Sequence, residues 1–332
     1  MKTNQILEEF SSLPPTEKER FIEDLIDQWE NDEGQMACVI KELEETRISL
    51  PSCVHCKSDK TLRRAKIKGI QRYSCKSCGK YWMATQGTSL SGLRKKSLWQ
   101  NYIKAFLRGL SIRKAALEVG VCIQTSFRWR HRLLSSISCY LPQSIGGIIE
   151  STDFPMPFSR KGERGINTTN KESGTSPDQI NIIMSVCRGK PESLSSVIKA
   201  SSLNEEQINK AISGKILHGS VHITNENLQY GLFKNSKVIE HLSVKIKTRP
   251  RKRELIHIKT AIQSQQAFLN FLQPFHGVAT KYLPNYLNWH HFKEFTQKRF
   301  DKVKQIMQAS LAGDQAQVWL EDITINDTII IT

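Results

Sequence analysis

The chain of 332 residues carries a formal net charge of +16, and 39% of its residues are hydrophobic. This length and composition are typical of a folded protein of two or three domains, and they exclude a chain that is mainly disordered. No apolar run approaches the roughly 20 residues that cross a bilayer, and the N-terminus lacks the features of a signal peptide. We therefore expect a soluble intracellular protein that does not bind membranes and whose cysteines are thiols or metal ligands.

The positive charge is concentrated in one part of the chain. Residues 1–50 contain 5 Lys and Arg against 13 Asp and Glu, whereas residues 51–150 contain 19 Lys and Arg against 3 Asp and Glu. A basic block of this strength beside an acidic segment predicts contact with a polyanion such as nucleic acid. The alternative is a basic surface that only faces solvent.

Residues 1–50 are predicted to form an acidic helical arm. Pro14 and Pro15 interrupt its first helix, and Thr16 with Glu19 has the spacing of a capping box for the next one. The arm can serve as a packing element, as an oligomerisation surface or as a partner-binding segment. The sequence leaves these three roles open.

Residues 51–92 contain two matched pairs of cysteines. Each pair has the pattern Cys-x2-Cys, and 18 residues separate the pairs. Each pair brings two thiolates onto one turn, and two such turns complete a tetrahedral four-sulfur zinc ribbon. Because four thiolates leave no open position for a substrate, the predicted zinc ion stabilises a segment too small to fold alone. The ligands are Cys53, Cys56, Cys75 and Cys78, which leave the neighbouring His55 facing solvent.

Residues 93–142 are predicted to form a helix-turn-helix domain. Helical periodicity covers residues 97–137, and Gly120 supplies the turn before an arginine-rich helix. Three positions on that helix, spaced i, i+3 and i+7, share one face that can enter a DNA groove, whereas its aromatic residues face inward. The alternative is an ordinary helical hairpin. The predicted DNA contacts are Thr125, Arg128, Arg130 and Arg132 on this helix, Lys95 and Lys96 before it, and Arg251 and Lys252 in a later basic run.

Residues 143–295 are predicted to form an α/β domain with a mixed sheet, because strand patterns come first and then alternate with helices. The expected strands are residues 145–154, 179–187, 194–200, 220–225 and 237–247, and the expected helices are residues 203–214 and 258–273. The polar residues 159–178 are predicted to be a mobile loop. Residues 296–332 complete the chain, with a closing helix expected over residues 293–312 and a β-prone tail over residues 323–331.

Two longer stretches resemble a known family. They read Thr-Ser-Phe-Arg-Trp-Arg-His-Arg at residues 125–132 and Phe-His-Gly-Val-Ala-Thr-Lys-Tyr-Leu-Pro-Asn-Tyr-Leu-Asn-Trp at residues 275–289. Together with the order of the cysteine pairs and helices, they resemble the ISXO-like insertion-sequence transposases over about residues 50–292. The resemblance implies a multidomain α+β protein of the bacterial cytoplasm and nucleoid, with a zinc ribbon, a helix-turn-helix and an RNase-H-like domain of the DDE type. It also implies that the chain binds double-stranded DNA. Whether the protein partner is a second copy of the chain or a related transposase is left open.

The chain departs from this family at the catalytic positions. Members of the family cut and join DNA with acidic side chains that hold two divalent metal ions. Where the family has Glu-x-Asp-Glu on its first strand, this chain has Glu-Ser-Thr-Asp, so the catalytic Asp position holds Thr152 and Asp153 follows it. The family's Thr-Asp-Gly is matched by Thr-Asn-Glu, with Asn225 at the Asp position. On the final helix, Thr260 and an isoleucine occupy the family's two Asn positions.

The replaced acids predict impaired catalysis, because an amide or a hydroxyl does not cancel the charge of two divalent cations. Asp153 is a remnant candidate, but alternation along a strand points it away from the face of Thr152 unless a bulge intervenes. The leading hypothesis is a zinc-containing, transposase-derived DNA-binding protein that acts as a regulator or an accessory factor.

Two alternatives stay open. The chain can be an active, Mg²⁺-dependent transposase in which Asp153, Glu226 and either Glu240 or Glu254 replace the missing ligands. It can instead be a protein-interaction factor, in which the acidic arm docks a partner and contact with DNA is incidental.

Overall fold

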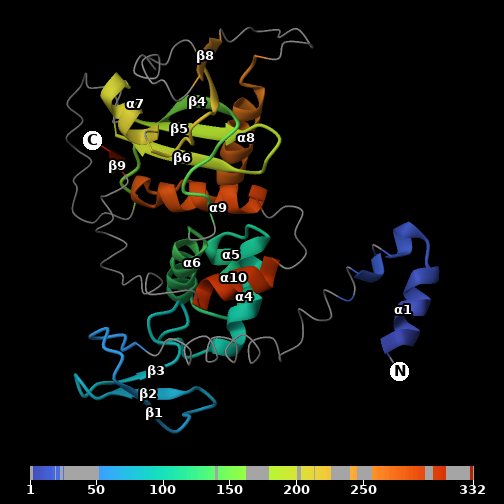
Figure 1. Cartoon of the computed structure of the whole chain (residues 1–332), viewed down its shortest axis with the longest axis vertical. Coiled ribbons are helices and arrows are strands. Elements are labelled where there is room, and N and C mark those ends of the chain that lie inside the picture. Colours follow the sequence, from blue (N-terminus) through green and yellow to red (C-terminus); the bar gives the residue numbers. More distant parts are fainter. Residues whose placement is uncertain are drawn as a thin grey trace. The chain divides into compact units, whose positions relative to one another are not determined.

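The structure of the chain is a computed structural model that covers all 332 residues (Figure 1). The residues described are 3–18, 20–22, 25, 52–138, 141–161, 179–199, 203–212, 214–225, 240–244, 256–295, 302–311 and 330–331. The chain divides into two compact units, Met1–Lys104 with Lys298–Asp314, and Ala105–Gln297 with Gln315–Thr332. Within the residues described, no helix is long and apolar enough to cross a membrane.

Some sequence predictions fall outside the described residues. They concern the arm beyond residue 25 and most of the loop expected over residues 159–178. They also include the substitute ligands Glu226 and Glu254, the side chain of Glu240, and the DNA contacts Arg251 and Lys252.

The N-terminal helices of the first unit are interrupted at the prolines. Helix α1 (Thr3–Ser12) ends before Pro14, and residues 15–18 and 20–22 are helical again. The residue before a proline avoids the helical conformation, which ends the first helix there. The rings of Phe10 and Phe21 lie 5.8 Å apart across this break. The predicted interruption is confirmed.

The first unit also contains a small antiparallel sheet. Its strands, in spatial order, are β1 (Thr61–Arg63), β2 (Arg72–Cys75) and β3 (Tyr81–Met83). Tyr73 and Trp82 face each other across β2 and β3, with stacked rings 5.5 Å apart. They pack with Ile70, Ala84 and two of the cysteines into a small core. The unit further contains η1 (Lys96–Leu98) and α10 (Lys302–Leu311), and α4 (Trp99–Leu107) includes the division between the units.

The second unit is built around a mixed six-stranded sheet in the order β8-β7-β4-β5-β6-β9. The strands are β4 (Ile148–Pro157), β5 (Gln179–Cys187), β6 (Ser193–Ile198), β7 (Val221–Asn225), β8 (Glu240–Val244) and β9 (Ile330–Ile331). Strands β4, β5 and β6 are antiparallel neighbours, whereas β7 runs parallel to β4 and β8 parallel to β7. The predicted mixed sheet is confirmed, with strand bounds that differ by a few residues.

Helices cover both faces of this sheet (Figure 1). Helix α7 (Glu205–Ile212) covers one face, and α8 (Lys259–Leu272) with α9 (Leu283–Phe295) covers the other. Residues of β5 alternate between the two layers, because successive side chains of a strand point to opposite faces. Ile183 packs in the α7 layer, whereas Ile182 and Met184 pack against α8 and α9.

Two further helices of the second unit, α5 (Ile112–Val119) and α6 (Ile123–Ile137), follow α4. Both were expected. The closing helix predicted over residues 293–312 is confirmed in α10 and in the end of α9, whereas the part of α9 from Leu283 to residue 292 was not predicted. Pro284 is compatible with the first turn of a helix and is a start signal there. That signal was missed in the sequence.

Candidate metal centre and nucleic-acid interface

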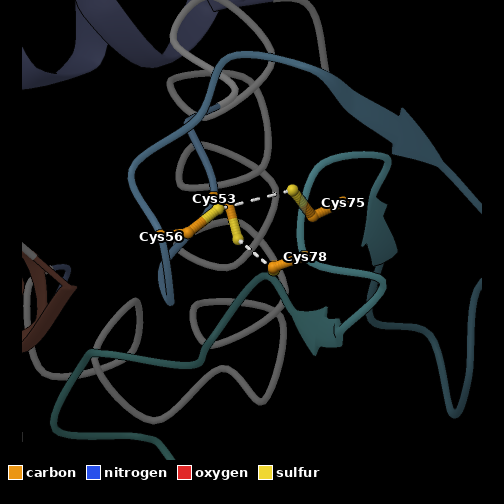
Figure 2. Close-up of side chains that lie close together, drawn as sticks. All are labelled: Cys53, Cys56, Cys75 and Cys78. Carbon is orange, nitrogen blue, oxygen red and sulfur yellow. Dashed lines mark hydrogen bonds between the residues drawn. The ribbon is translucent and has the colours of Figure 1, made fainter.

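Four cysteine side chains of the first unit point toward one another, as Figure 2 shows. The sulfur atoms all lie within 4.8 Å of one another. Cys53 Sγ is 3.7 Å from Cys78 Sγ, and Cys56 Sγ is 3.6 Å from Cys75 Sγ. A disulfide needs a distance of about 2.0 Å, whereas four sulfurs bound to one zinc ion lie about 3.8 Å apart. The spacing therefore fits a four-sulfur site that could hold a metal ion such as zinc.

The two cysteine turns repeat one backbone pattern. In each turn the backbone N–H two residues after the first cysteine donates to its sulfur, at 3.4 Å in one turn and 3.3 Å in the other. The residue after the second cysteine is left-handed in both turns, with φ of 58° at Lys57 and 69° at Gly79. Such a backbone costs a residue with a Cβ about 1–2 kcal/mol. The first turn therefore holds Lys57 in a backbone conformation that Gly79 adopts without strain in the second turn.

Backbone donors also favour the metal-binding form of one thiol. The N–H of Cys78, joined by that of Ser77, lowers the pKa of the Cys75 thiol to about 6. The thiolate is the form that ligates a metal. His55, beside these ligands, is exposed to solvent as expected.

Helices α5 and α6 are joined by a short turn that starts at Gly120. Ser111 caps α5 by accepting a hydrogen bond from the N–H of Lys114 at 3.4 Å. Gly120 ends α5 in the left-handed conformation that glycine adopts without strain. The hydroxyl of Ser126 on α6 donates to the carbonyl oxygen of Ile112 at 2.8 Å. This bond fixes α6 against the first turn of α5.

The predicted contact positions on α6 differ in exposure. Arg128 is exposed, whereas Thr125 and Arg132 are half-buried. The Thr125 hydroxyl lies 3.1 Å from Cys122 Sγ, so the turn before α6 positions it. Burial, followed by the nearby charge of Arg128, lowers the pKa of Arg132. The two arginines thus place their charges close together on α6.

Two predicted contacts belong to the first unit. Lys95 is exposed, and Lys96 begins η1 and is half-buried. Burial lowers the pKa of Lys96. Lys95 is therefore the more accessible of the two side chains.

Arg130 does not fit its predicted role as a DNA contact. Its side chain has no exposed surface. The guanidinium carbon lies 4.7 Å from the ring centre of Trp289 and 5.6 Å from that of Phe106. Nη2 donates to the carbonyl oxygen of Leu110 at 2.5 Å. Arg130 is therefore held among aromatic rings inside the second unit, because helical periodicity points it away from the face of Arg128.

Glu150 on β4 is buried in a network of donors at the start of α8. The backbone N–H groups of Thr260 and Ala261 donate to Oε2 at 2.7 Å and 3.3 Å. Arg188 Nε donates to Oε1 at 2.7 Å, and the Thr260 hydroxyl donates to the same oxygen at 3.1 Å. Arg188 Nη2 also donates to the carbonyl oxygen of His257 at 3.0 Å. A carboxylate at a helix N-terminus is stabilised by the helix dipole and by the free N–H groups. Arg188 was not identified from the sequence.

Thr152 and Asn225 occupy the sheet face that α8 covers. Ser151 pairs with Thr224 across the parallel strands β4 and β7, so the next residues of the two strands, Thr152 and Asn225, follow on the opposite face. Both side chains are buried. The Thr152 hydroxyl donates to Gln265 Oε1 of α8 at 3.5 Å. Neutral, buried side chains therefore occupy these two positions on the face that α8 covers.

Asp153 lies on the other face of the sheet. The ladder between β4 and β5 pairs every residue from Ile149 to Pro157 without a bulge. The bulge that would return Asp153 to the face of Thr152 is thus ruled out over this ladder. Burial raises the pKa of its half-buried carboxyl group. Asp153 and Glu150 therefore do not form a pair on one face.

Within the described part of the chain, a second group of metal-binding residue types lies on α9. It comprises His290, His291 and Glu294. However, both ring nitrogens of His291 already bond to hydroxyls, with Nδ1 2.5 Å from Ser193 Oγ and Nε2 2.7 Å from Ser195 Oγ. His290 Nε2 lies 3.7 Å from Glu294 Oε1. The bonds of His291 to the two serines of β6 join α9 to this strand, which gives the cluster a packing role.

Comparison with known proteins gives one relevant relative. The chain is 27% identical, over 170 residues, to an uncharacterized protein in transposable element ISH50 of Halobacterium salinarum. The match covers 47% of this chain, and it spans about half of that protein, 55% of its length. No family model matches the chain, and no solved structure matches it significantly. The similarity is consistent with an insertion-sequence protein.

Proposed function

We propose that this chain is a DNA-binding protein derived from an insertion-sequence transposase, with a structural zinc ion and impaired cleavage chemistry. The observation that carries the proposal is the α5–α6 pair, whose second helix exposes Arg128 beside Arg132. An exposed arginine with a half-buried one beside it, on the second helix of such a turn, suits contact with phosphates and base edges. The similarity to a protein of a transposable element supports the same origin.

The sheet topology supports an RNase-H-like ancestor. Three antiparallel strands, β4, β5 and β6, are followed by β7 and β8, which add to the free side of β4 in parallel orientation. Helix α8 then packs on the face formed by β4 and β5. This is the arrangement in which the catalytic acids of the resembled family would converge.

The chemistry of that place argues against cleavage. Two divalent cations about 4 Å apart need several anionic oxygen ligands. Here Thr152 and Asn225 are neutral, and Glu150 already accepts bonds from Arg188 and the start of α8. A metal ion at Glu150 would have to displace these donors. The protein would therefore act by binding DNA, as a regulator or an accessory factor of related elements.

The DNA-binding part of the proposal is tested by titrating a labelled random-sequence duplex with the full-length protein at several salt concentrations. We expect the affinity to fall steeply with salt, because bound Lys and Arg release counterions from the phosphates. Arg128→Gln should weaken binding and reduce the slope of log K against log salt by about 1. Lys210→Gln, which removes an equal charge from the exposed face of α7, is the matched control. A flat salt profile, or equal effects of the two substitutions, would contradict the proposal.

A further inference from the structure

A cavity of about 970 Å³ lies within the second unit, beside α6. Its walls come from the start of α5, from one side of α6 and from the loop between α8 and α9. Ile123 and Gln124, in the first turn of α6, belong to its rim and are exposed. The cavity thus opens next to the helix that carries Arg128. Its volume is at the upper end of the range for small-molecule sites.

The charge of the cavity walls is positive. Arg113, Lys161 and Lys281 line it, and among the residues that the structure describes no carboxylate does. Lys161 Nζ donates to the carbonyl oxygen of His276 at 2.9 Å, which holds the loop between α8 and α9. Arg113 is exposed at the rim. This charge balance suits an anionic occupant.

Aromatic rings form the inner wall. The rings of Phe127 and Tyr282 meet edge to face at 5.9 Å, and the ring of His131 lies 4.4 Å from each of them. Lys281 Nζ lies 5.2 Å from the ring centre of Tyr282. Rings beside cations are the combination on which the bases of unpaired nucleic acid stack while the phosphates are neutralised.

His131 also offers a polar atom that the fold does not use. Its side chain is 2% exposed, and among the residues described Nδ1 has no hydrogen-bond partner. A buried polar atom without a partner costs free energy unless another group reaches it. His131 is one of the residues that line the cavity, so its ring lies beside any occupant.

We propose that this cavity receives an unpaired nucleotide of the DNA bound by α6. Its base would stack on Tyr282 and Phe127, and Lys281 and Arg113 would hold the flanking phosphates. The inference depends on the DNA binding proposed above. It adds a preference for DNA ends or distorted sites that expose a single strand, because removing a base from an intact duplex costs unstacking energy.

The test compares a blunt random-sequence duplex with the same duplex carrying a short single-stranded tail. The full-length protein should bind the tailed DNA more tightly. Tyr282→Leu should weaken the binding of tailed DNA about fivefold or more, the lower end of the effect of losing one stacked base, and leave blunt-duplex binding unchanged. Lys281→Gln, which changes only a partly exposed side chain, should act in the same direction. Lys210→Gln is again the matched control.

A second readout locates the tail. A 5-iodouracil placed in the tail should cross-link, on illumination, to a peptide that contains Phe127 or Tyr282. Equal affinity for tailed and blunt DNA, or cross-links confined to other peptides, would overturn the cavity proposal while leaving DNA binding intact. If the wild-type protein binds neither the tailed nor the blunt DNA, the proposed function is refuted instead. Melting curves show whether Tyr282→Leu is folded, and Lys281→Gln decides the matter if it is not.

Discussion

The carboxylate of Glu150 accepts a hydrogen bond from the backbone N–H of Thr260 at 2.7 Å. The two residues lie on different elements, β4 and α8, and Thr260 stands at one of the two positions where the resembled family has Asn. In this chain their contact closes the start of α8 over the sheet. The carboxylate of Glu150 is thus engaged by the start of α8 and by the charge of Arg188.

Replacing Glu150 should therefore cost stability. Glu150→Gln should lower the free energy of unfolding by about 3 kcal/mol, because it leaves the charge of Arg188 without its buried partner. Asp153→Asn on the same strand is the control. It should leave stability unchanged or raise it at neutral pH, since burial raises the pKa of Asp153 and disfavours its carboxylate. Urea unfolding of both variants measures the difference, and equal losses would contradict this role of Glu150.

The four-sulfur site should bind one metal ion per chain. Cobalt exchanged into the site should give the visible absorption of a tetrahedral sulfur complex, because the sulfur spacing matches that geometry. Cys56→Ala should abolish this absorption, whereas Cys122→Ser, which alters an exposed cysteine on another element, should retain it. An octahedral spectrum, or absorption that survives Cys56→Ala, would show that the cysteines do not act as one site.

Stability should fall as the solution is made acidic. Burial lowers the pKa of His131, His222 and His291 from 6.5 to about 3, and that of His290 to about 4. Below pH 6.5 the unfolded chain therefore binds protons that the folded chain does not, and the free energy of unfolding decreases toward pH 4. Urea midpoints at pH 7 and pH 5 measure this loss. His131→Phe should reduce it, and identical midpoints for the wild type at both pH values would contradict the assignment.

Arg130 should contribute to packing and not to DNA affinity. Arg130→Met keeps most of the side-chain volume and removes a buried charge, so stability should stay within about 1 kcal/mol or increase. Arg130→Ala leaves a hole among Phe106, Phe275 and Trp289 and should cost about 3 kcal/mol. DNA titrations complete the test. If Arg130→Met lost as much DNA affinity as Arg128→Gln, Arg130 would have to contribute to DNA binding.

Local patterns account for what the sequence predicts well. The spacing of the cysteines brings the four sulfurs together because each pair lies on one short turn. Alternation along β4 separates Asp153 from Thr152, and the regular ladder with β5 agrees with that prediction. The contact of Arg188 with Glu150 depends instead on the register of β4 against β5. Helical spacing puts Arg130 off the face of Arg128, but its burial depends on the packing of α9, which is distant in sequence.

The most direct test of the central claim is to examine the DNA recovered from a protein complex. The zinc-loaded, full-length protein is bound to labelled duplex at low salt, supplied with Mn²⁺ and then analysed on native and denaturing gels. The account predicts a shifted complex on the native gel and intact strands on the denaturing gel. Nicked or joined strands that depend on the protein, or the absence of any complex, would contradict it.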